Sequence, residues 1–278
     1  DVVIANEDDD TVSVMFGDGA GGFAAVSTID VDDAPRGVVT GDVDGDGNAD
    51  IVSCNWMSST ASVLLGNGTG GFAPAAHFST EGSIGGTGIG PFALVMFDTD
   101  DDDDLDIVTS NVGFADFAVL ANTGAGSFDA ATIHDSPSAG HTMTAADITG
   151  DGATDLVLAM PGFLGSIPAF AVAEGTGGGF GDVTLSGGGL NPLGIAAGDL
   201  DGDGDMDAIG VNQGSMDCNV LINDGRGAFV EADIRLDVGF GPTSAVIADL
   251  DGDGDIDVAV ANRASDTISI FINETPVA

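Results

Sequence analysis

Hydrophobic residues in this chain occur in short runs, separated by stretches rich in glycine, asparagine, aspartate and proline. Valine, isoleucine and leucine dominate these runs, as at residues 50–55, 106–111 and 207–212. Short runs rich in β-branched residues and bordered by turn formers are typical of strands, and none is long enough for a good helix. The pattern predicts an all-β protein.

The runs recur with a period near fifty residues, and aligning them gives four segments per repeat. The first segment leads into an acidic loop and lies at 37–42, 92–98, 142–147, 193–199 and 243–249. The second leaves that loop at 50–55, 106–111, 155–160, 207–212 and 257–262. The third lies at 12–16, 62–66, 118–121, 170–173, 219–223 and 267–272. A glycine-rich turn then reaches Phe23, Phe72, Phe128, Phe180 or Phe229, and the fourth segment follows.

Four antiparallel strands in each repeat of ~50 residues predict the blades of a β-propeller. Second and third segments occur six times, because residues 1–6 match 257–262, whereas first and fourth segments occur five times. We therefore expect one propeller domain over 1–278, built from six repeats, the first truncated at its N-terminus. The first and last blades are expected to be incomplete. Seven blades, or completion by another chain, are the alternatives.

Five near-copies of one acidic loop lie between the first and second segments, at 42–50, 98–106, 147–155, 199–207 and 249–257. Aspartate occupies positions 1, 3, 5 and 9, and glycine at positions 4 and 6 allows a sharp turn. Ca²⁺ prefers six to eight oxygen ligands and tolerates irregular geometry. The loop differs from an EF-hand, because glutamate is missing at position 12 and a strand follows instead of a helix.

This loop, with a downstream Asn-x-Gly-x-Gly-x-Phe turn, resembles the FG-GAP/VCBS repeats that build integrin α-like propellers, and the resemblance covers essentially the whole chain. It implies about five Ca²⁺ ions, one in each loop, on the face opposite the usual ligand face. The implied ligands are Asp42, Asp44, Asp46, Asn48 (carbonyl) and Asp50; Asp98, Asp100, Asp102, Asp104 (carbonyl) and Asp106; Asp147, Asp151, Ala153 (carbonyl) and Asp155; Asp199, Asp201, Asp203, Asp205 (carbonyl) and Asp207; and Asp249, Asp251, Asp253, Asp255 (carbonyl) and Asp257.

Two loops depart from the repeated pattern. The third has Thr149 at position 3, which removes one carboxylate and is expected to weaken the site. The second has Asp101 and Asp103 where glycine is usual, which strains the turn if φ is positive there. The ions are expected to be structural, since carboxylates crowded into nine residues repel one another without metal.

The formal net charge is −42, with four arginines and no lysine. Such a surface excludes nucleic acid as a partner, because phosphate contacts need lysine and arginine. It suits cationic or neutral partners, and no run of hydrophobic residues is long enough for membrane insertion. Cys54 and Cys218 are far apart in the repeat alignment, so we expect free thiols.

The opposite face should carry the ligand site. The residue before each first segment is expected to ring the channel mouth, at Arg36, Phe92, His141, Leu193 and Thr243. Trp56, the single tryptophan, either stacks on a ligand or packs between blades, and Arg263 lies in a corresponding connection. The candidate ligand-binding residues are Arg36, Trp56, Phe92, His141 and Arg263.

Catalytic motifs are missing from the sequence. There is no Gly-x-Ser-x-Gly elbow and no His-Glu-x-x-His motif, and His77 and His134 fall in or beside fourth segments. We expect a non-enzymatic, extracellular or cell-surface adhesion module that recognises a protein or glycan. One alternative is a lectin or a polysaccharide lyase, for which Arg36 and His141 would be the reactive pair. Another is a structural subunit of an extracellular assembly or filament that self-associates through incomplete blades.

Overall fold

The computed structural model describes residues 1–23, 26–81, 90–113, 115–162 and 169–274. All regular secondary structure in these ranges is strand, and every strand pairing is antiparallel. The chain divides into two compact units, Asp1–Asp135 and Ser136–Ala278. Within the described part of the chain, no helix is present that could cross a membrane.

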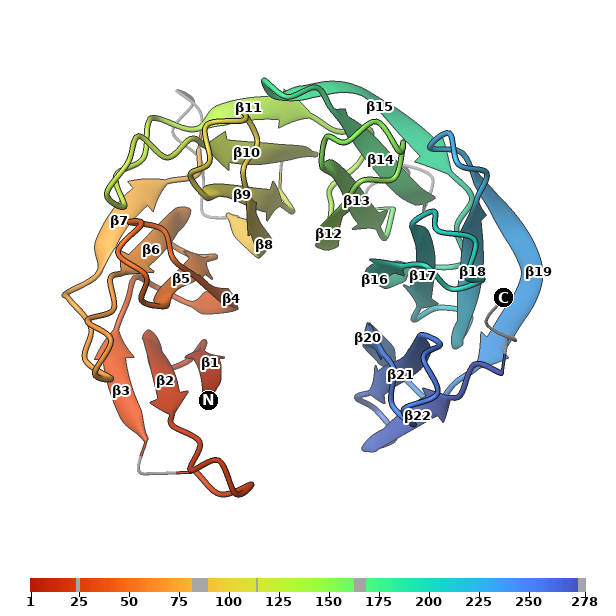
Figure 1. The fold of residues 1–278 in the computed structure, drawn as a ribbon, viewed down its shortest axis with the longest axis horizontal. Helices are drawn as coiled ribbons and strands as arrows, with labels where there is room; N and C mark the ends of the chain where they lie inside the picture. Colours follow the sequence, from red (N-terminus) through yellow and green to blue (C-terminus); the bar gives the residue numbers. More distant parts are fainter. Residues whose placement is uncertain (24–25, 82–89, 114, 163–168, 275–278) are drawn as a thin grey trace. The chain divides into compact units, whose positions relative to one another are not determined.

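Each unit contains three sheets in which consecutive strands are neighbours (Figure 1). The first unit has a three-stranded sheet of β1 (Val2–Asn6), β2 (Thr11–Met15) and β3 (Ser27–Asp30). Its second sheet is β4 (Pro35–Gly41), β5 (Asp50–Asn55), β6 (Thr60–Leu64) and β7 (Ala76–Ser79). Its third sheet is β8 (Pro91–Phe97), β9 (Asp106–Asn111), β10 (Asp116–Leu120) and β11 (Thr132–Asp135).

The second unit repeats this arrangement. Its first sheet is β12 (Thr142–Ala146), β13 (Asp155–Met160), β14 (Ala169–Gly175) and β15 (Phe180–Ser186). The next is β16 (Pro192–Gly198), β17 (Asp207–Asn212), β18 (Asp217–Asn223) and β19 (Phe229–Asp237). The last is β20 (Pro242–Ala248), β21 (Asp257–Asn262) and β22 (Thr267–Phe271).

Alternating side chains join neighbouring sheets within each unit. Val12 and Val14 of β2 pack against Ile51 and Leu64 of the next sheet, and all four are almost fully buried. Val52 and Val63, on the other face of that sheet, pack against Ile107 and Leu120. Because both faces of the middle sheet of each unit are covered, its second strand is buried along its whole length, as in β5 and β17.

The second strands have the predicted bounds. The inner strands, meaning the first strand of each four-segment repeat, begin one or two residues earlier than expected in four cases, whereas β12 begins at Thr142 as predicted. β4 starts at Pro35 and β8 at Pro91, and in both the pairing register shifts over the next residue. Arg36 and Phe92 are therefore the bulged second residues of strands, not residues that precede them. Proline lacks a backbone N–H and is tolerated at a strand start, a position that the repeat alignment read as loop.

Both cysteines are free and buried, as expected. Burial raises the pKa of the Cys54 thiol to about 12 and that of the Cys218 thiol to about 12. Cys54 Sγ accepts a hydrogen bond from the backbone N–H of Gly37 (3.3 Å). These thiols are core side chains and offer no reactive thiolate.

Candidate metal centres

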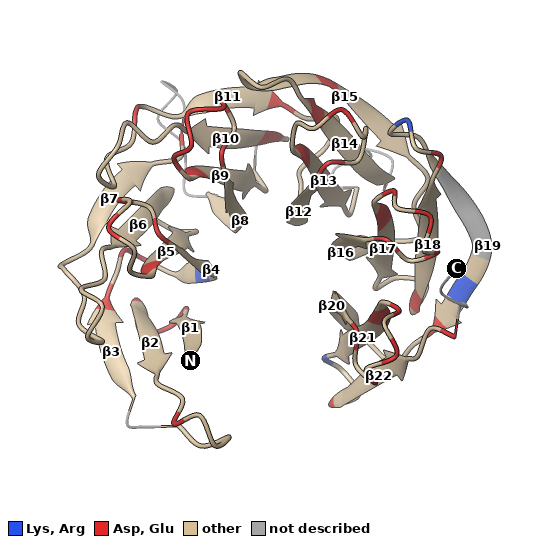
Figure 2. Cartoon of the chain, in the orientation of Figure 1, with Lys and Arg blue, Asp and Glu red and all other residues tan. Residues whose placement is uncertain are grey.

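The five acidic loops connect the inner strand of a sheet to its second strand, and acidic residues colour these connections red in Figure 2. The first aspartate of each loop folds the turn around its own carboxylate. Its Oδ2 accepts the backbone N–H of position 6, with N–O distances of 2.9 Å at Asp42, 2.8 Å at Asp98, 3.0 Å at Asp147, 3.1 Å at Asp199 and 3.2 Å at Asp249. The loop conformation is thus set by the first aspartate.

The ninth aspartate of each loop has a second role, as a buried clamp. All five, Asp50, Asp106, Asp155, Asp207 and Asp257, have no exposed surface. One oxygen accepts the N–H of loop position 2, as from Val43 to Asp50 (2.9 Å). The other accepts an N–H at the end of the third strand, as from Gly66 to Asp50 (2.6 Å). The same two contacts recur in the other four loops.

Asp1 matches this ninth position in the sixth, incomplete copy of the loop. Its Oδ1 accepts the backbone N–H of Gly17 at 2.8 Å, which is the contact that Asp50 makes with Gly66. The alignment of residues 1–6 with residues 257–262 therefore extends to this hydrogen bond.

Four loops bring three carboxylates together. Within each group the candidate ligand oxygens lie within 4.8 Å of one another. The groups are Asp42, Asp44 and Asp50; Asp98, Asp100 and Asp106; Asp199, Asp201 and Asp203; and Asp249, Asp251 and Asp257. The remaining implied ligands, including the position-7 carbonyls, lie in the same loops, and their coordination stays a prediction.

The third loop, 147–155, differs from the others. It is fully described, yet it has no such group of three, because Thr149 replaces the third aspartate. The Thr149 hydroxyl is buried without a hydrogen-bond partner, while its backbone N–H bonds Asp155 (2.9 Å). The expected weakening of this site therefore has a geometric cause.

Backbone strain in the second loop matches expectation. Asp101 and Asp103 have φ of 64° and 70°, in the region where the other loops place glycine. An L-residue there is strained by contact between its Cβ and the backbone. The aspartates keep the turn, at a conformational cost that glycine avoids.

The third-position carboxylates carry uncompensated charge. Partial desolvation, and then repulsion by neighbouring aspartates, raises the pKa of Asp44, Asp100, Asp201 and Asp251 above its ordinary value. A bound cation would remove this repulsion. The donors are all oxygens on a turn with positive φ, which suits a hard divalent cation and not a soft one. The residues of four loops fit Ca²⁺.

Three of the five candidate ligand residues meet at the strand ends opposite these loops. The Arg36 guanidinium lies over the Trp56 ring (3.7 Å to its centroid) and near the Phe92 ring (4.9 Å). It also pairs with Glu7 at 2.6 Å. Trp56 Nε1 is buried and without a hydrogen-bond partner. Arg36 thus covers one face of the tryptophan ring, so a ligand that approaches this face would contact the arginine.

The other two candidates belong to the second unit. His141 Nδ1 lies 3.2 Å from the Leu193 carbonyl oxygen. Arg263 is exposed just after β21, and its backbone N–H donates to the Gly241 carbonyl (2.9 Å). Arg36 and His141, the predicted reactive pair, therefore belong to different units and each has its own partner.

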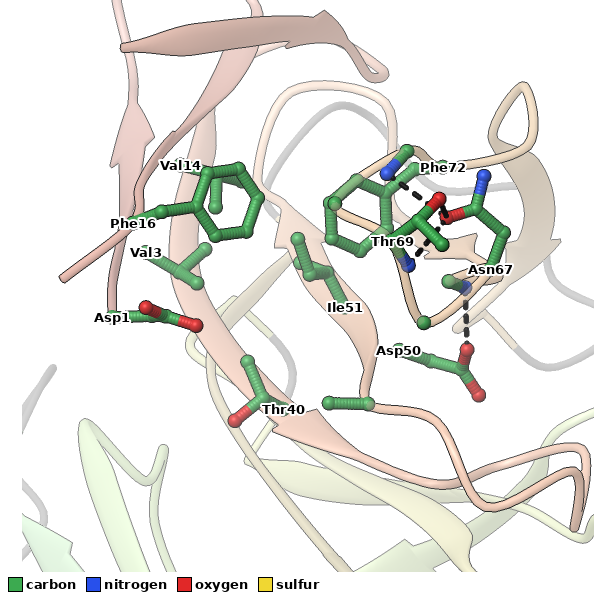
Figure 3. Close-up of a pocket in the computed structure, with 15 residues that line it drawn as sticks. Asp1, Val3, Val14, Phe16, Thr40, Asp50, Ile51, Asn67, Thr69 and Phe72 are labelled. Atoms are coloured by element: carbon green, nitrogen blue, oxygen red, sulfur yellow. Dashed lines mark hydrogen bonds between the residues drawn. The ribbon is translucent and has the colours of Figure 1, made fainter. Parts of the chain in front are cut away.

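A pocket of about 670 Å³ lies in the first unit (Figure 3). Phe16, Phe72 and Ile51 supply apolar walls, and Asp50 and Asn67 face it from the turn side. Both polar groups are used by the backbone, since Asp50 accepts from Gly66 and Asn67 from Thr69 (2.9 Å) and Gly71 (3.1 Å). The pocket contains none of the five candidate ligand-binding residues Arg36, Trp56, Phe92, His141 and Arg263, and no nucleophile with a base beside it.

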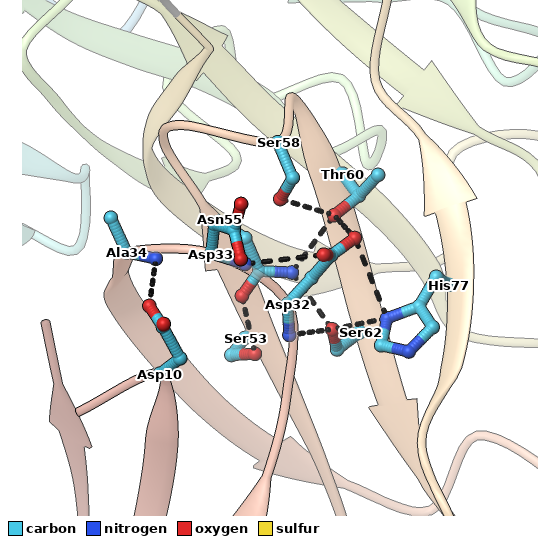
Figure 4. A network of polar contacts seen from close by, with 10 residues as sticks. All are labelled: Asp10, Asp32, Asp33, Ala34, Ser53, Asn55, Ser58, Thr60, Ser62 and His77. Atoms are coloured by element: carbon cyan, nitrogen blue, oxygen red, sulfur yellow. Dashed lines mark hydrogen bonds and ion pairs between the residues drawn. The ribbon is translucent and has the colours of Figure 1, made fainter.

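A serine, a histidine and an aspartate meet elsewhere in the first unit (Figure 4). Ser62 Oγ lies 2.9 Å and Asp32 Oδ2 lies 3.8 Å from the same nitrogen, His77 Nδ1. A hydrolase triad needs the serine and the carboxylate on opposite ring nitrogens. Ser62 is also fully buried and bonded to Asn55 (2.7 Å). This network supports the sheet and does not activate a nucleophile.

Sequence reasoning missed the residue at the end of the third strand. Asn122, Asn223 and Asn273 lie at or just after the end of that strand and contact two loops each. These asparagines are visible in the sequence as the first residue of the glycine-rich turn. Their role could not be predicted, because one of their contacts is made with a loop of the neighbouring sheet.

Comparisons with known proteins agree with this geometry. Residues 1–53 match the FG-GAP-like repeat family model. No curated protein sequence matches the chain. Similar solved structures include an Agrocybe aegerita lectin that recognises non-reducing terminal N-acetylglucosamine, at 20% identity and TM-score 0.57, covering 97% of this chain and 76% of the lectin. Kuenenia stuttgartiensis hydrazine synthase is 17% identical with TM-score 0.66, covering 99% and 80%. A putative 6-phosphogluconolactonase from Bacteroides uniformis is 14% identical with TM-score 0.63, covering 99% and 82%.

Likeness at such identity shows the fold alone. Residues 1–53 therefore match an FG-GAP-like repeat, the acidic loop of that repeat recurs along the chain, and the sheets have the β-propeller fold of the similar solved structures.

Proposed function

We propose that this chain is an extracellular or cell-surface β-propeller that binds Ca²⁺ through its acidic loops and acts as a non-enzymatic adhesion or recognition module. The observation that carries the proposal is the convergence of three carboxylates in each of four loops. The ions are structural, since each closes a connection between two strands of one sheet. The third loop is the weakest of five sites.

Equilibrium dialysis of metal-free protein against radioactive Ca²⁺ tests the metal. We expect four tight sites and one weaker site. The variant Asp42→Asn/Asp44→Asn removes two carboxylates of one group and should lower the tight stoichiometry by one. Asp8→Asn/Asp9→Asn is the matched control, because it removes the same charge from the exposed β1–β2 turn. Equal loss in both variants, or no tight binding in the parent protein, would contradict the proposal.

The recognition surface is proposed at the strand ends opposite the loops, around Arg36, Trp56 and Phe92. The cation–π contacts and the Glu7 ion pair support a preformed surface there. Positioned arginine and tryptophan side chains are typical of binding hot spots. The acidic surface elsewhere favours a neutral glycan or a cationic protein segment.

Fluorescence of Trp56 offers a direct probe, because it is the single tryptophan. An oligosaccharide ending in N-acetylglucosamine is a reasonable first ligand, since one propeller neighbour recognises that sugar. Saturable quenching that is lost in Arg36→Ala and kept in Arg263→Ala would support glycan recognition at this surface. Quenching that is equal in both variants would place the binding elsewhere.

An assembly subunit is the second candidate, favoured by the last sheet. Ile268 and Ile270 on one face of β22 are 69% and 59% exposed, and Ile272, just after the strand, is 45% exposed. A strand edge with an uncovered apolar face invites pairing with another chain. Light scattering across a concentration series tests this candidate: a constant monomer mass would rule it out. A lyase gains no support from Arg36 and His141, whose partners are described above.

A further inference from the structure

Three asparagines at the ends of third strands connect neighbouring repeats. They are Asn122, Asn223 and Asn273. The backbone N–H of each donates to Oδ1 of the ninth aspartate of its own loop, at 2.7 Å to Asp106, 2.8 Å to Asp207 and 2.8 Å to Asp257. Each asparagine is therefore attached to the loop of its own repeat.

The side-chain amide of each asparagine spans two loops. One N–H of Asn122 Nδ2 donates to the carbonyl of Leu105, the eighth residue of its own loop (3.1 Å). The other reaches the carbonyl of Val43, the second residue of the preceding loop (2.8 Å). Asn223 contacts Met206 (3.0 Å) and Ile148 (2.6 Å) in the same way, and Asn273 contacts Ile256 (3.3 Å) and Leu200 (2.9 Å).

The second loop residue closes the connection. Its carbonyl oxygen accepts a hydrogen bond from the asparagine side chain. Its backbone N–H donates to the ninth aspartate of its own loop, as from Val43 to Asp50 (2.9 Å). In the second unit these contacts form a continuous path, Asp155–Ile148–Asn223–Asp207–Leu200–Asn273–Asp257. In the first unit the path is Asp50–Val43–Asn122–Asp106.

The connection is tight where the asparagine is buried. Asn122 and Asn223 are each 3% exposed, and both N–H groups of each amide are used. Their amide oxygens accept the N–H of Gly124 (3.0 Å) and Gly225 (3.1 Å). A shift in one loop would therefore leave a buried polar group unpaired.

Two of the five repeats with a complete loop break the pattern and supply an internal comparison. Gly66 and Gly175 hold the same position, and their N–H groups still bond the ninth aspartates, Asp50 (2.6 Å) and Asp155 (2.7 Å). They have no side chain with which to reach a second loop. A Cβ at Gly66 would lie 2.2 Å from the Ala49 carbonyl oxygen, so this repeat has adapted to glycine.

We infer that these asparagines couple cation binding between neighbouring loops, an inference that rests on the proposed Ca²⁺ binding. The second loop residue lies between two ligand positions, so a cation that fixes positions 1 and 3 also fixes the carbonyl that the asparagine holds. A cation that orders one loop therefore also restricts the conformation of the neighbouring loop and strengthens its cation binding. Loops 42–50 and 98–106 form one coupled group, and loops 147–155, 199–207 and 249–257 form the other. The asparagines act as positioning residues and do not bind the ion.

A site-resolved titration tests the coupling in the first unit. The amide N–H of Gly47 donates to Asp42 (2.9 Å), so its NMR resonance reports Ca²⁺ binding in loop 42–50. Asp98→Asn/Asp100→Asn disables the neighbouring loop. In the parent protein we expect this change to weaken the Gly47 transition by at least roughly five-fold, the lower range of measured couplings. In an Asn122→Gly background the same change should leave the Gly47 midpoint unaltered.

Asn55→Ala is the matched control. Asn55 is fully buried at the far end of β5 and also uses both amide N–H groups, to Thr60 (3.0 Å) and Ser62 (2.7 Å). Its loss should lower stability but keep the coupling. Glycine is chosen at position 122 because Gly66 and Gly175 show that the fold accommodates it. The same cycle with Asn273→Gly, Asp249→Asn/Asp251→Asn and the Gly204 amide provides a second, independent reading.

Three outcomes are distinguishable. Coupling that is lost in Asn122→Gly and kept in Asn55→Ala supports the inference. Coupling that persists in Asn122→Gly, or is missing in the parent protein although Gly47 responds to Ca²⁺, overturns the inference and leaves the metal proposal standing. No response of Gly47 or Gly204 to Ca²⁺ overturns the metal proposal, and the coupling with it.

Discussion

The same residue type performs two tasks in each acidic loop. Aspartates at the first, third and fifth positions are partly or fully exposed and shape the turn, whereas the ninth is buried and holds two strands together. Because the ninth aspartate is a charged acceptor, its hydrogen bonds to backbone N–H groups are stronger than those of a neutral acceptor. Removing it would also leave two buried N–H groups without a partner. The two kinds of position should therefore respond differently to the same substitution.

Asp50→Asn tests the clamp. The amide keeps the shape of the side chain but turns one acceptor into a donor that faces an N–H group. We expect a loss of about 3 kcal/mol in the free energy of unfolding, because hydrogen bonds to charged groups are strong. Urea denaturation in the presence of a chelator measures it. Asp46→Asn, at an exposed position of the same loop, should change this value by less than about 0.5 kcal/mol.

Asp103→Gly tests strain in the second loop. Glycine adopts the observed φ of 70° without steric cost, so the metal-free protein should gain about 1 kcal/mol. Asp103→Ala removes the same carboxylate but keeps the Cβ, and it should gain clearly less. If both variants are stabilised equally, charge relief and not backbone strain explains the effect. Urea midpoints of the metal-free variants decide between them.

The raised pKa values of Asp44, Asp100, Asp201 and Asp251 predict an unusual pH dependence. The folded, metal-free protein binds protons on these groups at a pH where the unfolded chain does not, so its stability falls as pH rises through the raised pKa values. Carboxyls with a lowered pKa, such as Asp217, stay ionised in both states above about pH 5 and do not offset this trend.

We therefore expect the urea midpoint of the metal-free protein to rise as the pH is lowered from neutrality towards the raised pKa values of these carboxyls. Saturating Ca²⁺ should abolish or reverse that trend, because the ion needs the ionised carboxylates. A metal-free midpoint that falls over the same interval would show that repulsion among these carboxylates does not govern stability. The absence of a Ca²⁺ effect on the trend would count against the metal proposal.

At the scale of elements, the sequence predicts what depends on local pattern. The bounds of all five complete second strands follow from their apolar runs after the loop. The starts of the inner strands do not, because Pro35 and Pro91 resemble loop residues while their strand pairing depends on a bulge. The contacts of Asn122 and the stacking of Arg36 on Trp56 also join residues distant in sequence, and no single repeat reveals them.

Thr149→Asp tests the weak third loop. The substitution restores the third carboxylate, and Asp147, Asp151 and Asp155 are already in place around it. We expect about a ten-fold gain in Ca²⁺ affinity, read from the amide resonance of Gly152, which bonds Asp147 (3.0 Å). Thr149→Asn adds no charge and serves as the control. Equal affinities in both variants would mean that ligand charge does not limit this loop.

At the scale of the whole molecule, charge is the dominant feature. The formal net charge is −42, and repulsion of this size opposes the compact state. Cations bound where the carboxylates converge would offset part of this repulsion. One site at a Ca²⁺ concentration 100 times its dissociation constant adds about 2.7 kcal/mol to stability. Four such sites would together add about 11 kcal/mol, which is comparable to the whole free energy of unfolding of a typical domain.

Thermal unfolding with saturating Ca²⁺ and with excess chelator, at matched ionic strength, tests this claim most directly. We predict that Ca²⁺ raises the melting temperature by more than about 10 °C, and that Mg²⁺ at the same concentration raises it far less, because the loops offer irregular oxygen geometry. Equal melting temperatures in Ca²⁺, Mg²⁺ and chelator would contradict the account, since the acidic loops would then hold their fold without a cation.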